Sequence, residues 1–492
     1  MSLQISDDPH YDYKEIRADR KSGVLLHISS LPSPYGIGTM GAKAREFIDF
    51  LVQANQSYWQ ILPLGPTGYG DSPYQTFSTR AGNPYLIDLD QLMQEGVILE
   101  DELKLFDFGS NPEKVDFNLM WRNRLLLLRK GWQRFHAGHL PALNKEFESF
   151  RQAEGDDWLN EYALFMSIKG EYKGASWSDW LDPLRLRDPV KLAEFSKFHR
   201  DDIDFQKFVQ FLFFRQWQHL HSYARKAGID IMGDLPIYVA ADSVEVWSEP
   251  ELFQLDENLI PTFVSGTPPD DYAEGGQLWG SPLFKWELHE ERGFDWWIER
   301  VRFQMRFFDL MRLDHFRGFE SFWAIPYGDE TARSGQWVKG PADKLFDAIK
   351  KELGDLPLFA EDLGYITREV SEFRERTGFP SMKILQSALN PDASSDFLPH
   401  NLVENAILYT GTHDNDTILG WLKTADPEEI EFAVRYLGLS DEEGKAWGLM
   451  RGAATTVCRT VIYQMQDLLG LGNEARMNVP ATLSGNWQWR MK

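Results

Sequence analysis

The sequence predicts a (β/α)8 barrel, an α/β fold in which eight parallel strands alternate with helices. Three observations indicate it: eight short apolar segments resemble strands, helical patterns separate them, and acidic residues gather at the C-terminal ends of the fourth, fifth and seventh segments. In barrels of this kind the C-terminal ends of the strands carry the active site. The position of the acidic residues therefore predicts an enzyme.

The predicted strands are apolar runs, as expected for parallel strands that are covered on both faces. A helix with one apolar face is predicted over residues 42–54, between the first two strands, and no repeat of fixed period occurs. The strands are expected at residues 23–30, 58–64, 228–239, 310–314, 356–364, 382–388, 406–414 and 460–469, the last being the least distinct.

The chain is predicted to contain one barrel with additions. Residues 1–22 are polar and charged, and we expect an N-terminal arm that packs loosely, followed by a catalytic barrel over residues 23–492. Residues 90–225 carry Leu, Phe, Trp and charges at helical spacing, which predicts a largely helical insertion. Residues 264–280 are dense in Gly and Pro, which predicts a loop that acts as a lid.

Composition narrows the class of ligand. The chain has 492 residues and a formal charge of −24, so neither nucleic acid nor an anionic membrane surface is an expected partner. The expected ligands are therefore neutral or cationic. Eighteen Trp and seventeen Tyr residues suit stacking on sugar rings, although most of them are expected in the core.

Cellular location is indicated by two further features. Cys458 is the single cysteine, which excludes an internal disulfide and favours a reducing compartment. No segment approaches about 18 continuous apolar residues, and the N-terminus lacks the hydrophobic core of a signal peptide. The sequence therefore predicts a protein outside the membrane, in the cytoplasm.

Asp314 is the predicted chemical centre of the chain. It ends the fourth strand, two residues after Arg312, so both side chains point to the same side of that strand. A guanidinium beside a carboxylate favours its ionised form, so we expect Arg312 to hold the pKa of Asp314 down and keep it available as a nucleophile. A purely structural Arg–Asp pair is the alternative for this motif taken alone.

Two further acidic residues at strand ends, Glu361 and Asp414, favour a catalytic role for Asp314 over a structural one. Glu361 follows an apolar strand, which should raise its pKa and suit a general acid, whereas a structural, salt-bridged acid is the alternative. One ionised and one protonated carboxyl group are what retaining glycoside hydrolysis requires. Asp414, together with His413, would hold hydroxyl groups of the distorted sugar.

Two other kinds of site, a phosphate-binding loop and a metal site, have partial support in the sequence. Residues 65–74 are rich in glycine but lack the Gly-Lys-Ser/Thr of a phosphate loop. A loop presenting Tyr69, Asp71, Ser72 and Tyr74 to a polar ligand fits better than a phosphate loop, and a surface turn is an equal alternative. His413 with Asp416 could hold a divalent ion, but neither H-x-H nor HExxH spacing is present. We therefore expect neither a metal nor another cofactor.

Several motifs together resemble a known family. The chain is similar to the 4-α-glucanotransferases, also called amylomaltase or disproportionating enzyme (glycoside hydrolase family 77), from about Gly23 to the C-terminus. The resemblance implies an α-amylase-type barrel with helical insertions and no separate C-terminal β-domain. The motifs that carry it are residues 23–38, 65–86, 233–246, 264–286, 312–318, 360–364, 410–417 and 476–490.

The resemblance also implies roles for individual residues. The catalytic positions of the family fall on Asp314 (nucleophile), Glu361 (general acid/base) and Asp414 (stabiliser of the transition state). Ala481 stands where the family has glycine, and the polar extension before Gly23 is not a family feature. The substrate-contact positions fall on Arg312, His413, Asp234, Ser72, Tyr74, Gln277 and Trp279, with Tyr69 on a further glucan-binding surface.

The implied activity is transfer of α-1,4-glucan segments between maltooligosaccharides or starch-type chains. Trp279 and the loop at 266–276 are expected to form an acceptor site that favours sugar over water. A hydrolase, a non-catalytic glucan-binding protein and a metal-dependent barrel enzyme are the alternatives. Cyclisation and oligomeric state stay open, and a plastid that handles starch is the alternative to the cytoplasm.

Overall fold

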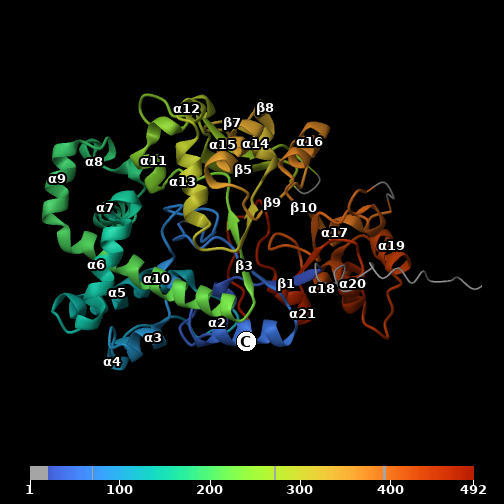
Figure 1. The fold of residues 1–492 in the computed structure, drawn as a ribbon, viewed down its shortest axis with the longest axis horizontal. Coiled ribbons are helices and arrows are strands. Elements are labelled where there is room, and N and C mark those ends of the chain that lie inside the picture. The colour runs from blue at the N-terminus through green and yellow to red at the C-terminus, as the bar shows by residue number, and fades with distance from the viewer. Residues whose placement is uncertain (1–19, 69, 271–272, 392–394) are drawn as a thin grey trace, which may run out of the picture.

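The computed structural model of the chain describes residues 20–68, 70–270, 273–391 and 395–492. Eight parallel strands form a closed barrel in the order β1-β12-β11-β10-β9-β6-β3-β2, which confirms the predicted fold class (Figure 1). The barrel strands are β1 (Lys21–Leu25), β2 (Tyr58–Gln60), β3 (Asp230–Leu235), β6 (Leu310–Leu313), β9 (Leu358–Ala360), β10 (Ser381–Ile384), β11 (Ala406–Tyr409) and β12 (Thr460–Gln464).

The boundaries of the strands differ from the predicted ones. Strand β1 begins at Lys21, inside the predicted N-terminal arm, of which residues 1–19 lie outside the described part of the chain. Strand β10 ends at Ile384, and the last residues of that predicted strand form α17 (Leu385–Ala388) instead. A short apolar run has the same sequence pattern in a buried strand and in a buried helical turn, so periodicity could not separate them.

The segment between β2 and β3 is largely helical, and its helices lie on one side of the barrel (Figure 1). The longest is α10, whose buried face includes Phe208, Trp217 and Leu220. Asp116 and Asp188 accept hydrogen bonds from backbone amides at the starts of α5 and α9, as N-cap residues do. The helices are α3 (Leu89–Gln94), α4 (Glu100–Leu103), α5 (Phe117–His136), α6 (Pro141–Glu154), α7 (Asn160–Glu171), α8 (Asp182–Arg185), α9 (Pro189–Phe198) and α10 (Arg200–Lys226).

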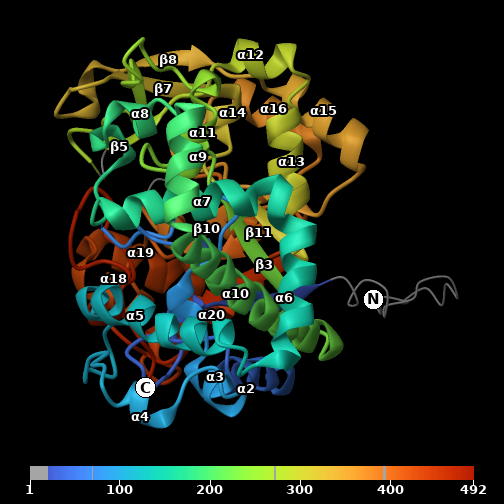
Figure 2. The same ribbon diagram turned by 90° about the vertical axis from the view of Figure 1, so that its left-hand side faces the viewer.

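Other helices surround the remaining strands, and Figure 2 shows the same arrangement from the side of the helical segment. No helix among the described residues is both long and apolar enough to cross a membrane. These other helices are α2 (Ala42–Gln53), α11 (Val244–Ser248), α12 (Trp286–Glu291), α13 (Asp295–Gln304), α14 (Arg317–Glu320), α15 (Asp343–Leu353), α16 (Arg368–Thr377), α18 (Ile418–Thr424), α19 (Pro427–Leu437), α20 (Lys445–Ala454) and α21 (Met465–Leu468).

A second, antiparallel sheet was not predicted. Its strand order is β5-β4-β7-β8, so both ends of the predicted loop at 264–280 are strands and that part of the prediction is wrong. Gly266 explains the error: a Cβ there would lie 2.1 Å from the carbonyl oxygen of Gln277, so this glycine permits close strand pairing. The strands are β4 (Phe263–Thr267), β5 (Gln277–Pro282), β7 (Ser321–Pro326) and β8 (Gln336–Lys339).

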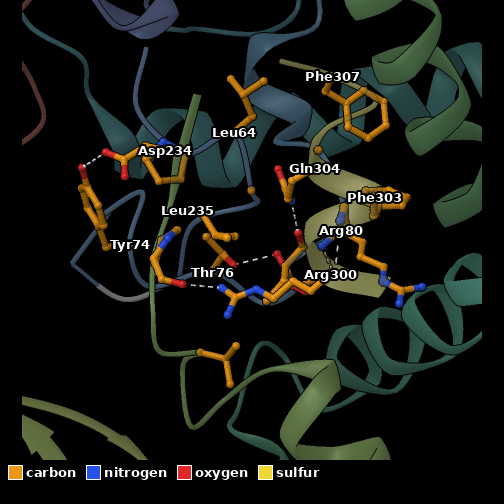
Figure 3. A pocket seen from close by; sticks show the side chains of 18 of the residues that line it. Leu64, Tyr74, Thr76, Arg80, Asp234, Leu235, Arg300, Phe303, Gln304 and Phe307 are labelled. Atoms are coloured by element: carbon orange, nitrogen blue, oxygen red, sulfur yellow. Dashed lines mark hydrogen bonds between the residues drawn. The ribbon is translucent and has the colours of Figure 1, made fainter. Parts of the chain in front are cut away.

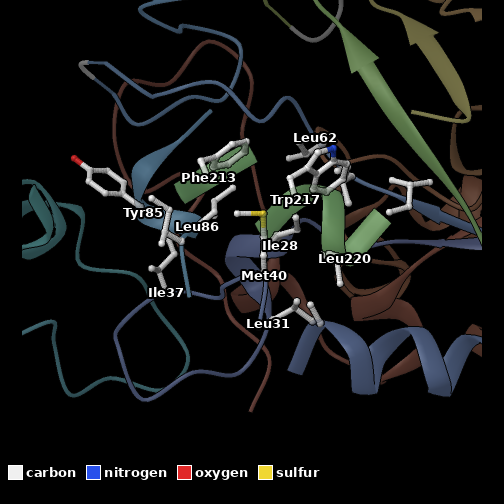
Figure 4. Packing of buried hydrophobic residues seen from close by; sticks show 14 of the residues in the cluster. Ile28, Leu31, Ile37, Met40, Leu62, Tyr85, Leu86, Phe213, Trp217 and Leu220 are labelled. Atoms are coloured by element: carbon white, nitrogen blue, oxygen red, sulfur yellow. The ribbon is translucent and has the colours of Figure 1, made fainter. Parts of the chain in front are cut away.

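The barrel and α10 share a continuous hydrophobic core (Figure 4). Ile28 and Leu31, which follow β1, are fully buried, as is Leu62 after β2. Phe213 and Trp217 of α10 belong to the same cluster and are almost fully buried. Burying each large apolar side chain contributes about 1.5–3 kcal/mol, so the loops after β1 and β2 are anchored to the helix that covers them.

Candidate active site

Arg312 organises the centre of the site. It lies on β6, its side chain is buried, and it pairs in register with Asp234 of β3 and Phe359 of β9. Its Nη1 donates to Oδ1 and Oδ2 of Asp234 and to Oδ1 of Asp314, each at 2.8 Å, and its Nη2 lies 3.5 Å from Oε2 of Glu361. One guanidinium thus gathers three carboxylates from three neighbouring strands.

Backbone hydrogen bonds hold Asp314 and Glu361 in place. The amide of Asp314 donates to the carbonyl of Leu235 at 3.0 Å, and the amide of His315 donates to Oε2 of Glu361 at 2.6 Å. The amide of Phe316 also donates to the carbonyl of Glu361 at 3.1 Å. The segment that follows the proposed nucleophile therefore positions the proposed acid/base directly.

The pKa values of the two carboxyl groups are both raised. Burial raises the pKa of Asp314 to about 7 and that of Glu361 to about 8, while Arg312 opposes each increase. The expectation that Arg312 would hold the pKa of Asp314 down is not met, because burial outweighs one guanidinium whose charge Asp234 also shares. The charge of Asp314 adds to the increase in the pKa of Glu361.

Asp414 lies in the loop after β11 and is held by the C-terminal segment. Asn478 Nδ2 donates to Oδ1 of Asp414 at 2.6 Å, and Arg476 Nη2 donates to its carbonyl oxygen, also at 2.6 Å. His413 Nε2 lies 3.4 Å from Oδ2 of Asp414, and burial lowers the pKa of His413, so its imidazole is neutral. The side chain of Asp414 is 44% exposed and is available to a ligand.

Tyr74 connects the loop after β2 to this group. Its hydroxyl donates to Oδ2 of Asp234 at 2.7 Å, as Figure 3 shows. Its ring stacks on His413, with the centroids 5.2 Å apart, and lies 6.0 Å from the ring of Trp487. Ser72 Oγ accepts a hydrogen bond from the amide of Tyr74 at 3.2 Å, which shapes the turn that presents the tyrosine.

Gln277 and Trp279 come from the second sheet. Trp279 Nε1 donates to Oε1 of Gln277 at 3.2 Å. The indole meets the imidazole of His315 edge to face, with centroids 4.8 Å apart, and lies 6.1 Å from the ring of Tyr238. Strand β5 thus places Trp279 beside the residue that follows Asp314. The remaining predicted contact, Tyr69, lies outside the described residues.

Several residues of the site were not selected from the sequence. Arg476 and Asn478 hold Asp414, Trp487 packs against Tyr74 and His413, and His315 connects Glu361 with Trp279. Residues 477–480 form a Met-Asn-x-Pro motif inside the stretch at 476–490, but the sequence alone indicates no role for its asparagine. No spacing rule links it to Asp414, about 60 positions earlier in the chain.

A cavity lies behind Asp234, between the loops after β2 and β3 and the helices α10 and α13 (Figure 3). The volume of the cavity, including the part open to solvent, is about 630 Å³. Of the predicted site residues that the structure describes, Tyr74 and Asp234 line it. Arg300 of α13 crosses its wall and donates to the carbonyl oxygens of Pro236 and Ile237 at 2.6 and 3.1 Å. We assign no chemistry to it, because the other carboxylates lie elsewhere.

The donor set around the carboxylates does not favour a metal ion. Within the described residues, no group of three or more His, Cys, Asp or Glu side chains could hold one. Asp234, Asp314 and Glu361 already contact the guanidinium of Arg312. A cation there would compete with a buried positive charge.

The chain is similar to the same family of known proteins in sequence and in structure. The sequence profile described as 4-alpha-glucanotransferase matches residues 26–492. The chain is 48% identical to the 4-alpha-glucanotransferase of Clostridium butyricum, with 95% of each chain covered, and 47% identical to that of Thermus thermophilus, with 96% and 95% covered. The solved amylomaltase from Streptococcus agalactiae in complex with acarbose is 42% identical, with a TM-score of 0.93 over 96% of this chain and 95% of that one.

Proposed function

The chain belongs to the 4-alpha-glucanotransferase family, enzymes that act on glucans, and on that premise we propose that it transfers α-1,4-glucan segments by a retaining double displacement. Donors and acceptors are maltooligosaccharides or starch-type glucans, with glucose as the smallest acceptor and cycloamylose as a further product. The observation that carries the proposal is the contact of Asp314 and Glu361 with one buried guanidinium, which brings together the two carboxyl groups that a double displacement needs.

In the first step, Asp314 Oδ attacks the anomeric carbon of the donor sugar. The glycosidic bond breaks, and Glu361 gives its proton to the departing oxygen, which leaves as the new non-reducing end of the released chain. The products are a glycosyl ester on Asp314 and a carboxylate at Glu361. Burial supports this step because it raises the pKa of Glu361 and so favours the protonated acid.

In the second step, Glu361 accepts the proton of an acceptor hydroxyl group. The acceptor oxygen attacks the anomeric carbon, the ester bond breaks, and Asp314 is released as a carboxylate. Two inversions at one carbon retain its configuration. Asp414, Asp234 and His413 hold the hydroxyl groups of the distorted sugar, and Arg312 keeps the carboxylates in register.

Transfer rather than hydrolysis depends on the acceptor side. We assign that side to Trp279 and Gln277, because the indole lies beside His315, which follows the proposed nucleophile. The Streptococcus agalactiae amylomaltase was solved with acarbose, and we carry ligand binding of that kind to this chain. Ser72 and Tyr74 then contact the sugar from the loop after β2, and Tyr69 from a further surface.

Incubation with maltotriose tests the proposal. We expect glucose together with a ladder of longer maltooligosaccharides, and few new reducing ends. The Glu361→Gln variant should lose activity by a factor of about 10²–10⁴, the usual contribution of a general acid/base. Short products with one new reducing end for each bond broken would instead indicate a hydrolase, and an unaffected Glu361→Gln variant would indicate that the assigned acid/base is wrong.

We also propose a cytoplasmic location, with a plastid as the alternative. A buried free thiol at Cys458 suits a reducing compartment. The alternative is supported by the relatives from Arabidopsis thaliana and Solanum tuberosum, both 42% identical, whose names place them in chloroplasts or amyloplasts.

A further inference from the structure

Two exposed aromatic side chains lie close to the loops that carry Asp314 and Glu361. Trp337 of β8 is 37% exposed, and Tyr365, in the connection between β9 and α16, is 68% exposed. The proposed mechanism uses neither of them. Flat aromatic rings offer apolar area for stacking on sugar rings, so their position next to the site calls for an explanation.

Arg317 joins these two aromatic residues to the catalytic loops. It begins α14 three residues after Asp314, and its side chain is buried. Its guanidinium carbon lies 3.7 Å from the centroid of the Trp337 ring, and its Nη1 donates to the backbone carbonyl of Tyr365. Its Nη2 also donates to Ser321 Oγ at 2.9 Å. One buried cation therefore contacts the ring of Trp337 and the backbone of Tyr365.

The Trp337 ring is held by the second sheet. Trp337 pairs in register with Trp323 of β7, and the two rings lie 5.1 Å apart at 66°. Trp323 Nε1 donates to the carbonyl of Ala332 at 2.8 Å, and a Cβ on Gly335 would lie 2.2 Å from that same nitrogen. An exposed side chain with such support is pre-organised, and a ligand that stacks on it need not order it first.

We propose that Trp337 and Tyr365 form a contact surface for an α-1,4-glucan chain beyond the sugars at the carboxylates, an inference that rests on the proposed function. Tyr365 follows Glu361 by four residues, so the surface continues directly from the catalytic loop. Helices α14 and α16 lie side by side in both views (Figures 1 and 2). A neutral polymer suits a chain with a formal charge of −24, which would repel a polyanion.

Binding at two chain lengths tests this surface. In the Glu361→Gln background, calorimetric titration compares maltotriose with maltoheptaose for Trp337→Ala and Tyr365→Ala. Loss of one aromatic contact of about 0.5–1.5 kcal/mol corresponds to a Kd about two- to tenfold weaker. We expect that loss for maltoheptaose and a clearly smaller one for maltotriose. Trp447→Ala is the matched control: Trp447 is 57% exposed on α20, and we expect no change at either length.

Equal losses of affinity for maltotriose and maltoheptaose, or no loss for either, would show that Trp337 and Tyr365 do not form this contact surface. Turnover of maltotriose by the unsubstituted chain separates this result from a failure of the proposed function, since that turnover does not depend on the surface. Trp337→Phe keeps a ring over Arg317 and should recover most of the maltoheptaose affinity. Thermal unfolding checks each variant, and Tyr365→Ala removes a side chain that is too exposed to support the fold, so it gives a result even if Trp337→Ala is unstable.

Discussion

At the scale of single residues, the site is an arrangement of three carboxylates around one cation. Asp234, Asp314 and Glu361 all contact Arg312, so full ionisation would leave a buried excess of negative charge. Retaining one proton relieves that excess. Glu361 has the longest contact with the guanidinium, 3.5 Å against 2.8 Å for the other two, so the guanidinium stabilises its ionised form least.

The pH dependence of activity follows from these two groups. Asp314 must be ionised, so kcat/KM should fall as the pH decreases through about 7, and Glu361 must be protonated, so it should also fall as the pH rises through about 8. We expect a narrow bell with a maximum between these values, measured as glucose released from maltotriose. In Glu361→Gln the residual activity should lose the alkaline limb. An acidic limb near pH 4 would show that burial does not control Asp314.

Ala481 is the residue where the chain departs from the family's glycine, and its backbone is left-handed with φ of 61°. This conformation costs an L-residue about 1–2 kcal/mol. Ala481→Gly should therefore raise the unfolding free energy, by roughly 0.5–1 kcal/mol after the greater chain entropy of glycine is counted. Denaturant unfolding measures it. The control is Ala348→Gly in the middle of α15, where glycine should instead destabilise by about 1 kcal/mol.

At the scale of secondary-structure elements, the second sheet completes the site. Strand β5 carries Gln277 and Trp279 to the residue after the nucleophile, and β8 carries Trp337 to Arg317. The amides and carbonyls of β4 pair with β5 on one side and with β7 on the other. This pairing makes the sheet a fixed support for Trp279.

Trp279 tests the acceptor role of that sheet. Trp279→Ala should reduce transfer about tenfold more than hydrolysis, because removing a stacking surface of about 1.4 kcal/mol disfavours a sugar acceptor but not water. The measurement is the ratio of longer maltooligosaccharides to new reducing ends. Trp279→Phe retains an aromatic face and should keep most of the ratio. If both activities fell by the same factor, the acceptor assignment would be wrong.

At the scale of the whole molecule, the barrel closes where the first and last strands meet. Strand β1 pairs with β12, and the segment after β12 returns to the site with Asn478 and Trp487. The helical segment between β2 and β3 covers the outside of the barrel through α10, and α13 ties the loops after β2 and β3 together through Gln304 and Arg300. Residues that are distant in the sequence thus meet at the same end of the barrel.

Much of this organisation is local in the sequence. Most residues of the barrel strands are buried and apolar, and Asp314 and Glu361 directly follow β6 and β9, while Asp414 lies a few residues after β11. The fold class and the positions of these three acidic residues could therefore be predicted from local pattern. The second sheet could not, because β4 pairs with β7 more than 50 residues later and its glycines have the composition of a loop. The supporting contacts of Asp414 were missed for the same reason.

The sequence by itself determined which carboxylates end which strands, since apolar periodicity and acidic termini are properties of short segments. Only the tertiary structure decided how deeply those carboxylates are buried, which cation they share and which aromatic side chains lie beside them. Burial and the shared guanidinium of Arg312 act on the pKa values in opposite directions, and both depend on strands β3, β6 and β9 lying side by side. Side-chain pairing across strands is a property of three-dimensional neighbours, which no short window of sequence contains.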